Sequence, residues 1–128
     1  MIQVTEEAIA PGIVIDETKT ESSGCVATYV GLIRNRSHGK HVLYVEYQDL
    51  DGTAARQLEQ IADEMMAKWL LNKVSICHRV GRLKVGEVNF LVAVAAAHRR
   101  EGFAACRYAV DRFKEIMPTK KTEVFEPE

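Results

Sequence analysis

The chain of 128 residues has few aromatic residues, no paired cysteine motif and no long apolar run. An aromatic content of 7% leaves few rings on which bases can stack, which disfavours a small RNA-binding domain. The three cysteines, Cys25, Cys77 and Cys106, are widely separated, so neither a disulfide framework nor a zinc site is indicated. We expect reduced cysteines in or near the core. The four histidines form no recognisable ligand set, and we predict no metal and no cofactor.

A membrane-spanning segment is also missing, because the longest apolar run covers only residues 90–97. Residues 1–7 lack the basic start and apolar stretch of a signal peptide, so we expect a cytoplasmic protein. With 47% hydrophobic residues the chain can bury an adequate core without disulfides. No repeat or linker divides it, and we expect one domain over residues 1–128.

Net charge is nearly absent as well, with 17 Lys and Arg residues against 18 Asp and Glu residues. The charges are unevenly distributed, however. Residues 98–121 hold seven cations against three acids, a local net charge of +4, whereas residues 1–23 hold five acids and one lysine. This split favours a focused anionic ligand over general affinity for nucleic acid or membrane. A basic run alone is more often a solvated helix face.

Four segments are predicted to be strands. Residues 24–34 and 41–47 are rich in β-branched and aromatic residues, and residues 74–78 and 88–95 are apolar enough for central strands. In the second segment the apolar side, which we expect to face inward, comprises Leu43, Val45 and Tyr47.

Two helices are predicted from apolar residues that recur at helical spacing. The first stripe consists of Ala54, Leu58, Ile61, Met65 and Trp69. The second helix runs from about Glu101 to Met117 and ends before Pro118, with a stripe of Phe103, Cys106, Val110, Phe113 and Met117. The order strand, strand, helix, strand, strand, helix predicts an α+β fold with two main helices packed against a largely antiparallel sheet.

The basic segment contains two candidate sites. His98 and Arg99 stand where the last strand gives way to the helix, and the free N–H groups at a helix start suit a phosphate. Alternatively, His98 satisfies a backbone group and Arg99 pairs with Glu101 or with a distant carboxylate. On the same helix Arg100, Arg107 and Lys114 are seven residues apart and therefore form a line beside the apolar stripe.

Lys114 at the helix end and Lys121 on an extended segment can approach one pocket from two directions. Neighbouring ammonium groups disfavour each other's charge, which prepares a lysine for proton transfer, and either can stabilise an anion. Lysines near a helix C-terminus are, however, more often surface residues that suit the helix dipole. Arg34, at a strand end, is either a fork for phosphate or carboxylate or a solvent-facing strand terminus.

Four groups of residues, in order over nearly the whole chain, resemble successive signatures of the family of catalytic large subunits of molybdopterin synthase. They are Tyr29 to Asn35, then His78 to Leu83 with Gly86 and Glu87, then Ala97-His98-Arg99 with Phe103 and Ala104, and finally Asp111 to Lys114 with Pro118 and Lys121-Thr122-Glu123. Each group alone is weak. Four groups in register make the resemblance specific.

The resemblance implies an α/β-hammerhead-like fold and a sulfurtransferase. Its reaction would transfer sulfur to cyclic pyranopterin monophosphate, which creates the dithiolene of molybdopterin. A small ubiquitin-like partner would bring the sulfur as a C-terminal Gly-Gly thiocarboxylate, and the large subunit would form the central homodimer of a heterotetramer. No cysteine of this chain would need to carry sulfur, and both ligands of the basic site would be anionic.

By position, Lys114 and Lys121 match the two catalytic lysines of the family, while Arg34, His98 and Arg99 match its substrate-binding residues. Arg79 also belongs to a family motif, but an ion pair at a strand end accounts for it equally well. Lys120 stands where the family commonly has tryptophan. The alternative function is a non-catalytic dimeric adaptor that binds a ubiquitin-like tail or a phosphorylated pterin.

Overall fold

The computed structural model describes residues 1–127, so the predicted domain range of 1–128 includes Glu128, which lies outside the described residues. The elements follow in the order β1 (Ile2–Thr5), α1 (Pro11–Thr18), β2 (Cys25–Leu32), β3 (Arg36–Ser37), β4 (Lys40–Gln48), α2 (Ala54–Lys68), β5 (Lys73–Arg79), β6 (Gly81–Lys84), β7 (Val88–Ala96), α3 (Arg99–Ile116) and β8 (Lys120–Phe125). The predicted strands and both predicted helices are present. Strands β1, β3 and β6 and helix α1 were not predicted from the sequence.

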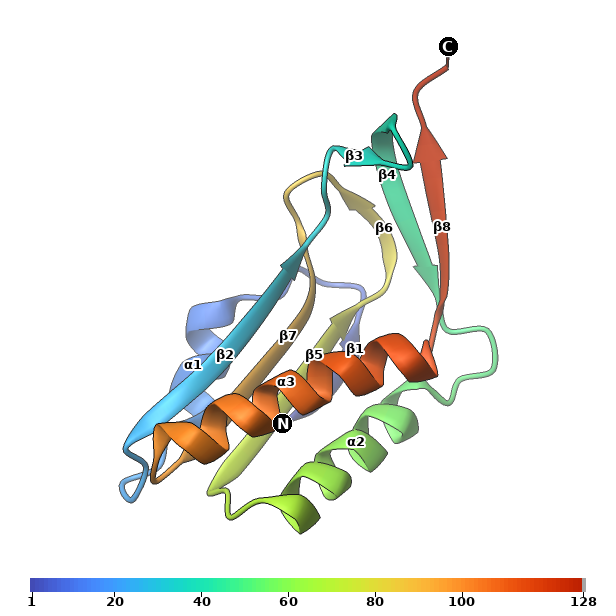
Figure 1. Cartoon of the computed structure of the whole chain (residues 1–128). Coiled ribbons are helices and arrows are strands. Elements are labelled where there is room, and N and C mark those ends of the chain that lie inside the picture. Colours follow the sequence, from blue (N-terminus) through green and yellow to red (C-terminus); the bar gives the residue numbers. More distant parts are fainter. Residues whose placement is uncertain (128) are drawn as a thin grey trace.

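The main sheet has the strand order β1-β5-β7-β2 (Figure 1). Strand β7 pairs antiparallel with both β5 and β2, and β1 pairs parallel with β5. The predicted α+β fold with a largely antiparallel sheet is therefore confirmed. Strand β1 has only four residues and joins a strand that is distant in sequence, so a local pattern could not reveal it.

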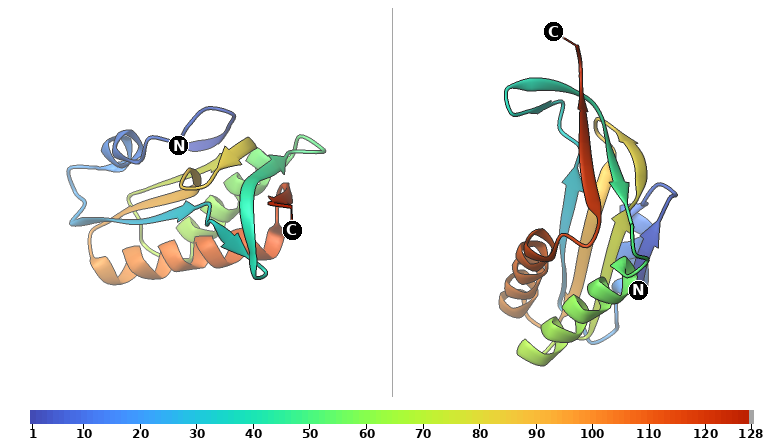
Figure 2. Two further views of the ribbon diagram at one scale, coloured as in Figure 1. Left: turned by 90° about the horizontal axis from the view of Figure 1, so that it is seen from above. Right: turned by 90° about the vertical axis from the view of Figure 1, so that its right-hand side faces the viewer.

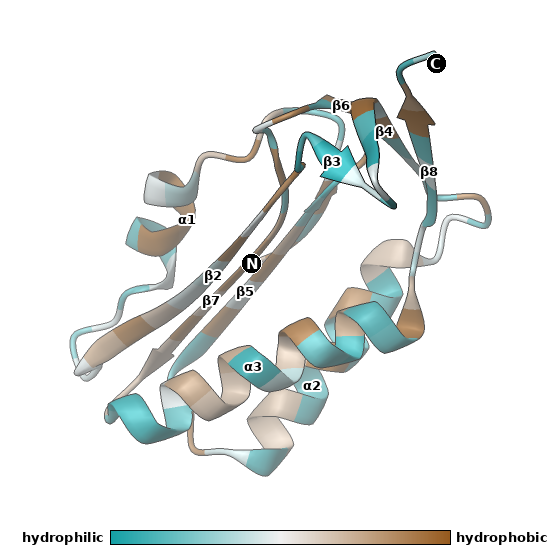
Figure 3. Ribbon diagram, turned by 45° about the horizontal axis from the view of Figure 1, so that its top comes forward, coloured by the Kyte–Doolittle hydropathy of each residue, from teal (hydrophilic) through white to brown (hydrophobic). Residues whose placement is uncertain are grey.

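Helices α2 and α3 lie side by side on one face of the main sheet, and the shorter α1 lies on the other face (Figure 2). The first four residues of the predicted α2 stripe are fully buried, and Trp69 packs at its end. Figure 3 shows the apolar strands β2, β7 and β5 between these helical layers. The core is therefore divided into two layers by the sheet.

The predicted stripe of α3 is partly wrong. Phe103 and Met117 have exposed fractions of 64% and 67%, and the buried residues of the helix are Gly102, Ala105, Cys106 and Ala109. The physical reason is close packing on β2, since a Cβ atom on Gly102 would lie 3.2 Å from Cys25 Sγ. Small residues let α3 approach the sheet.

A second sheet has β4 at its centre, where β4 pairs antiparallel with β3, β6 and β8 (Figure 1). The inner face of β4 was predicted correctly for Val45 and Tyr47, which are buried, but not for Leu43, which is 47% exposed. Val42 is buried instead. The pairing with β8 shifts register between Val42 and Tyr44, and such an irregularity reverses which residues face inward.

The cysteines lie where the sequence analysis placed them. Cys77 and Cys106 are buried and Cys25 is half-buried, each with a free thiol. Burial raises the pKa of the Cys106 thiol to about 11, so this thiol is protonated at neutral pH. Among residues 1–127, no helix combines the length and the apolar character needed to span a bilayer.

Candidate functional site

Lys114 and Lys121 line one pocket of about 260 Å³, which we call the lysine pocket. Lys114 lies in the last turn of α3 and Lys121 lies on β8. The remaining lining residues are Tyr47, Asn89, Phe113, Met117, Pro118 and Thr119. The structure therefore brings together the two lysines for which the sequence predicted a common site.

The turn between α3 and β8 produces this arrangement. Met117 adopts a left-handed backbone conformation with φ 51°, and its N–H donates to the Phe113 carbonyl at 2.9 Å. Pro118 has no N–H and cannot continue the helix. The chain then enters β8, whose antiparallel pairing with β4 places Lys121 opposite Tyr47. The helix end and the strand register together set the separation of the two lysines.

Arg34 lies in a smaller adjoining pocket of about 60 Å³, which we call the arginine pocket. Lys121 and Asn89 line both pockets, so the two pockets adjoin at these residues. Glu123 also lines the arginine pocket, and its carboxylate lies 3.8 Å from Nε2 of His38.

Arg34, Lys114 and Lys121 are exposed and form no ion pair among residues 1–127. The neighbouring Arg36 and Lys120 are likewise exposed and without an ion pair there. Arg107 and Arg112, in contrast, pair with acids on the helices. The part of the basic run that contains Arg107 and Arg112 is thus a solvated helix face, which is the usual role of such a run. Of the unpaired cations in this run, Lys114 and Lys121 line the lysine pocket, where together with Arg34 they suit an anionic ligand. Arg99 and Arg100, which also form no ion pair among residues 1–127, lie at the other end of α3.

His98 and Arg99 lie at the opposite end of α3 from Lys114. Lys114 follows His98 by sixteen positions, and at 1.5 Å per residue this corresponds to about 24 Å along the helix. His98 and Arg99 are both exposed, and Arg99 forms no ion pair with Glu101. The fold of one chain therefore does not bring the His98-Arg99 pair into the lysine pocket, and their substrate-binding role stays a prediction.

The buried His78 is hydrogen-bonded to Thr119, one of the residues that line the lysine pocket. His78 is fully buried, with Nδ1 2.8 Å from the Asn89 carbonyl oxygen and Nε2 2.8 Å from Thr119 Oγ1. The carbonyl only accepts, so Nδ1 carries a hydrogen. Burial lowers the pKa of His78 below its usual 6.5, so the ring is neutral and Nε2 accepts from the Thr119 hydroxyl. This bond anchors the residue that follows Pro118.

Tyr47, Asn89 and Thr119 line the lysine pocket but were not predicted as site residues from the sequence. Each is an ordinary strand or turn residue in the sequence, and no motif distinguishes it. Their convergence depends on contacts between residues about 40 positions apart, such as His78 with Thr119 and Asn89 with Tyr47. Only the assembled fold reveals that they line the lysine pocket.

Arg79 has the structural role that was one of its two predicted readings. Its guanidinium lies 3.0 Å from Glu87 and also donates to the Glu6 carbonyl at 3.1 Å. The Lys84 backbone N–H and the Arg79 guanidinium together hold the pKa of Glu87 below its usual value. Arg79 thus links the end of β5 to the start of β7.

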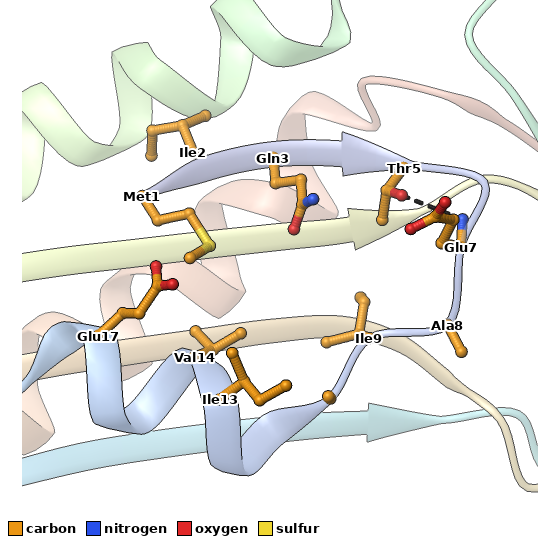
Figure 4. Close-up of a pocket in the computed structure, with 11 residues that line it drawn as sticks. Met1, Ile2, Gln3, Thr5, Glu7, Ala8, Ile9, Ile13, Val14 and Glu17 are labelled. Carbon is orange, nitrogen blue, oxygen red and sulfur yellow. Dashed lines mark hydrogen bonds between the residues drawn. The ribbon is translucent and has the colours of Figure 1, made fainter.

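A larger hollow of about 460 Å³ lies between β1 and α1 (Figure 4), and neither Lys114 nor Lys121 lines it. Glu7 and Glu17 are its charged lining residues, and it is otherwise lined largely by apolar side chains. It lacks the cations that an anionic ligand needs. Within residues 1–127 no group of three or more His, Cys, Asp or Glu residues is placed to hold a metal ion.

Comparison with known proteins shows the family. A family model described as MoaE protein matches residues 4–116. A relative from Halalkalibacterium halodurans, named molybdopterin synthase catalytic subunit, is 36% identical over 123 residues, which covers 96% of this chain and 79% of the relative.

Two solved structures share the fold. Molybdopterin synthase from Staphylococcus aureus superposes with a TM-score of 0.92 at 33% identity, covering 99% of this chain and 93% of the other. A complex of subunits 1 and 2 of molybdopterin-converting factor from Helicobacter pylori has a TM-score of 0.80 at 14% identity, covering 100% and 88%. The second likeness concerns the fold alone.

The fold and the pocket define an α+β protein with an exposed cationic site built from a helix end and a strand. The chain belongs to the MoaE protein family. Membership confirms the predicted resemblance to catalytic subunits of molybdopterin synthase, and with it the prediction of an enzyme.

Proposed function

We propose that this chain transfers sulfur from the C-terminal thiocarboxylate of a small ubiquitin-like partner to cyclic pyranopterin monophosphate, as the catalytic subunit of a molybdopterin synthase. The observation that carries this proposal is the shared pocket of Lys114 and Lys121, which adjoins the pocket that Arg34 lines. Family membership supplies the reaction, and the unpaired cations supply a site for two anionic substrates.

Lys114 and Lys121 are assigned to the thiocarboxylate. Sulfur leaves a thiocarboxylate when it has bonded to the pterin and water adds to the carbonyl carbon, which places negative charge on the oxygen. The bond between sulfur and the carbonyl carbon then breaks, leaving the sulfur on the pterin and a carboxylate on the tail. Two ammonium groups fixed beside that oxygen stabilise the charge without reorganisation and can move protons. Because Lys114 is on α3 and Lys121 on β8, they approach the oxygen from different sides.

Arg34 is assigned to the phosphate of the pterin. A guanidinium binds phosphate through paired N–H groups, and Arg34 has no acid among residues 1–127 with which it pairs. Its pocket adjoins the lysine pocket through Lys121 and Asn89. The phosphate and the reacting part of the substrate can therefore be bound in neighbouring positions.

An open hollow of about 480 Å³ offers a path for the partner's tail. It shares Met117, Pro118, Thr119 and Lys121 with the lysine pocket and extends toward Leu50 and Gln57. Leu50 and Met117 are 71% and 67% exposed, so the path has an apolar border. A Gly-Gly tail is narrow enough to lie extended along such a border.

The second copy of a homodimer is assigned a part in the site. His98 and Arg99 are about 24 Å along α3 from Lys114, so they serve the lysine pocket only if they belong to another copy. Strand β2 is an edge of the main sheet, and near it Val30, Leu32 and Phe103 are exposed apolar residues suited to an interface. With two partners, the homodimer makes a heterotetramer.

We assign the reaction to the cytoplasm, where the three free cysteines stay reduced.

A turnover assay tests the function. The chain is mixed with thiocarboxylated partner and cyclic pyranopterin monophosphate, and the dithiolene product is measured for wild type, Lys114→Ala and Lys121→Ala. Arg107→Ala is the matched control, because Arg107 is an exposed cation on α3 outside both pockets. We expect product from wild type and Arg107→Ala and its loss in both lysine variants. A folded wild-type chain that binds the partner without making product would instead be an adaptor.

A further inference from the structure

Tyr47 is the neighbour of Lys121 across the two paired strands of the second sheet. The two residues are direct partners in the antiparallel register of β4 and β8. Directly opposite side chains point to the same face and have Cβ atoms about 5 Å apart. Tyr47 and Lys121 both line the lysine pocket. The phenol ring therefore lies beside a lysine that is assigned to the substrate.

The hydroxyl of Tyr47 is oriented by Asn89. Asn89 Nδ2 donates to Tyr47 Oη at 2.8 Å, which occupies an acceptor position of the hydroxyl and leaves its own hydrogen available. The other end of the amide, Oδ1, is buried against Gly31, where a Cβ atom would lie 2.6 Å from that oxygen, and it has no hydrogen-bond partner among residues 1–127. Glycine at this position thus makes room for the amide that orients the hydroxyl.

The ring of Tyr47 is fixed as well. It meets His78 edge-on at a centroid distance of 4.9 Å, and His78 is itself held by the Asn89 carbonyl and Thr119. The exposed fraction of Tyr47 is 6%, and burial raises its pKa above the usual 10.0. The phenol is therefore protonated at neutral pH. A fixed, protonated hydroxyl costs no reorganisation when it meets an anion.

We propose that Tyr47 is a third substrate-contacting group of the lysine pocket: its hydroxyl donates a hydrogen bond to the terminal oxygen of the partner's tail, and Asn89 is the positioning residue that orients it. This inference rests on the proposed function, because it takes the tail to be the ligand of the lysine pocket. No proton is transferred by Tyr47. The hydrogen bond strengthens as water adds to the carbonyl carbon and negative charge develops on the oxygen, and so favours the breaking of the carbon–sulfur bond, which leaves a carboxylate on the tail and the sulfur on the pterin.

The first test compares Tyr47→Phe with Tyr44→Phe in the turnover assay. Tyr44 is on the same strand, but its ring packs against Arg82 at 4.1 Å and it lines neither pocket. Loss of one preorganised donor lowers kcat by about 100-fold, so we expect that fall for Tyr47→Phe and none for Tyr44→Phe. The KM for the pterin should not change. Equal kcat for wild type and Tyr47→Phe would overturn the proposal.

Asn89→Leu tests the positioning role. If Asn89 acts through the hydroxyl of Tyr47, then Asn89→Leu lowers kcat in the wild-type background but has no further effect on kcat in the Tyr47→Phe background. A residue with a merely structural role would lower kcat equally in both backgrounds. Additive effects would therefore contradict the assigned role of Asn89.

A binding measurement separates this inference from the proposed function. The partner in its carboxylate-ended form is titrated into wild type and Tyr47→Phe, together with a partner truncated by its last two glycines. A hydrogen bond to a charged group predicts about tenfold weaker binding of the full partner to Tyr47→Phe, and unchanged binding of the truncated one. This comparison decides the role of Tyr47 even if wild type makes no product. Equal affinities of wild type and variant for the full partner would overturn it.

Discussion

Glu64 of α2 and Arg112 of α3 form a two-point contact in which Arg112 Nε lies 2.9 Å from Oε1 and a terminal nitrogen lies 3.2 Å from Oε2. Tyr108 also donates to Glu64 Oε1, at 2.6 Å. This contact holds α3 against α2 only two residues before Lys114. It therefore stabilises the helix end that carries one of the two pocket lysines.

Glu64→Gln is expected to lower the free energy of unfolding by about 1 kcal/mol. Hydrogen bonds to a charged group contribute somewhat more than this when buried, and the partial exposure of Glu64 reduces the effect. Chemical denaturation measures the change. Glu59→Gln is the control, since Glu59 is an exposed acid on the same helix that pairs with no cation in residues 1–127. A loss of equal size in Glu59→Gln would show that the contact with Arg112 is not the cause.

The same contact predicts a pH dependence. Hydrogen bonds from Arg112 and Tyr108 lower the pKa of Glu64 from 4.5 to about 2 in the folded chain. A group whose pKa is lower in the folded state stabilises the fold above its unfolded pKa, and this contribution disappears as pH falls through the folded value. The stability difference between wild type and Glu64→Gln should thus be full above pH 4.5 and shrink toward pH 2. A difference that is constant over this range would contradict the assignment.

How far the sequence predicted the fold differs between the two long helices. In α2 large apolar residues form the buried stripe, and the periodic pattern located them correctly. In α3 the buried residues near the start are small, because Gly102 packs closely on Cys25 and Ala27 of β2. A pattern of large apolar residues does not report close contact between small ones, so Phe103 was assigned to the wrong face.

The part of the candidate site that a short turn brings together was predictable from the sequence. Lys114 and Lys121 are seven residues apart, and Pro118 between them signals the change from helix to strand. Tyr47 and Asn89 come from strands that meet only in the assembled protein, and their hydrogen bond spans 42 positions. No local pattern contains that information.

Gly102→Ala is expected to destabilise the fold by about 1–3 kcal/mol, as overpacking in a dense contact does. The new methyl group would lie 3.2 Å from Cys25 Sγ and 3.4 Å from Ala27 Cβ, so the Cys25 side chain or α3 must shift by a few tenths of an ångström. Thermal unfolding measures the effect. Gly12→Ala is the control, because nothing lies within 4 Å of a Cβ atom there and alanine favours the helix. Unchanged stability of Gly102→Ala would mean that α3 has room at this position.

Thr119→Val tests the support of the lysine pocket by His78. Valine has nearly the shape of threonine but cannot donate to Nε2 of His78, which leaves that buried nitrogen without its partner. We expect reduced kcat and lower stability, and recovery of both in Thr119→Ser, which keeps the hydroxyl. Turnover and thermal unfolding are measured together for the three proteins. Failure of serine to restore kcat would show that the hydroxyl is not the feature that matters.

Hybrid dimers test whether His98 and Arg99 serve the lysine pocket of the second copy. Lys114→Ala and Arg99→Ala chains are co-expressed with different tags, and the dimers that carry both tags are isolated. If Arg99 acts across the dimer, one site of each hybrid contains both defects and the other contains neither, so about half of the wild-type activity returns. If Arg99 acts within its own chain, each site keeps one defect and the hybrid is as inactive as its parents. The separation of about 24 Å along α3 leads us to expect the first result.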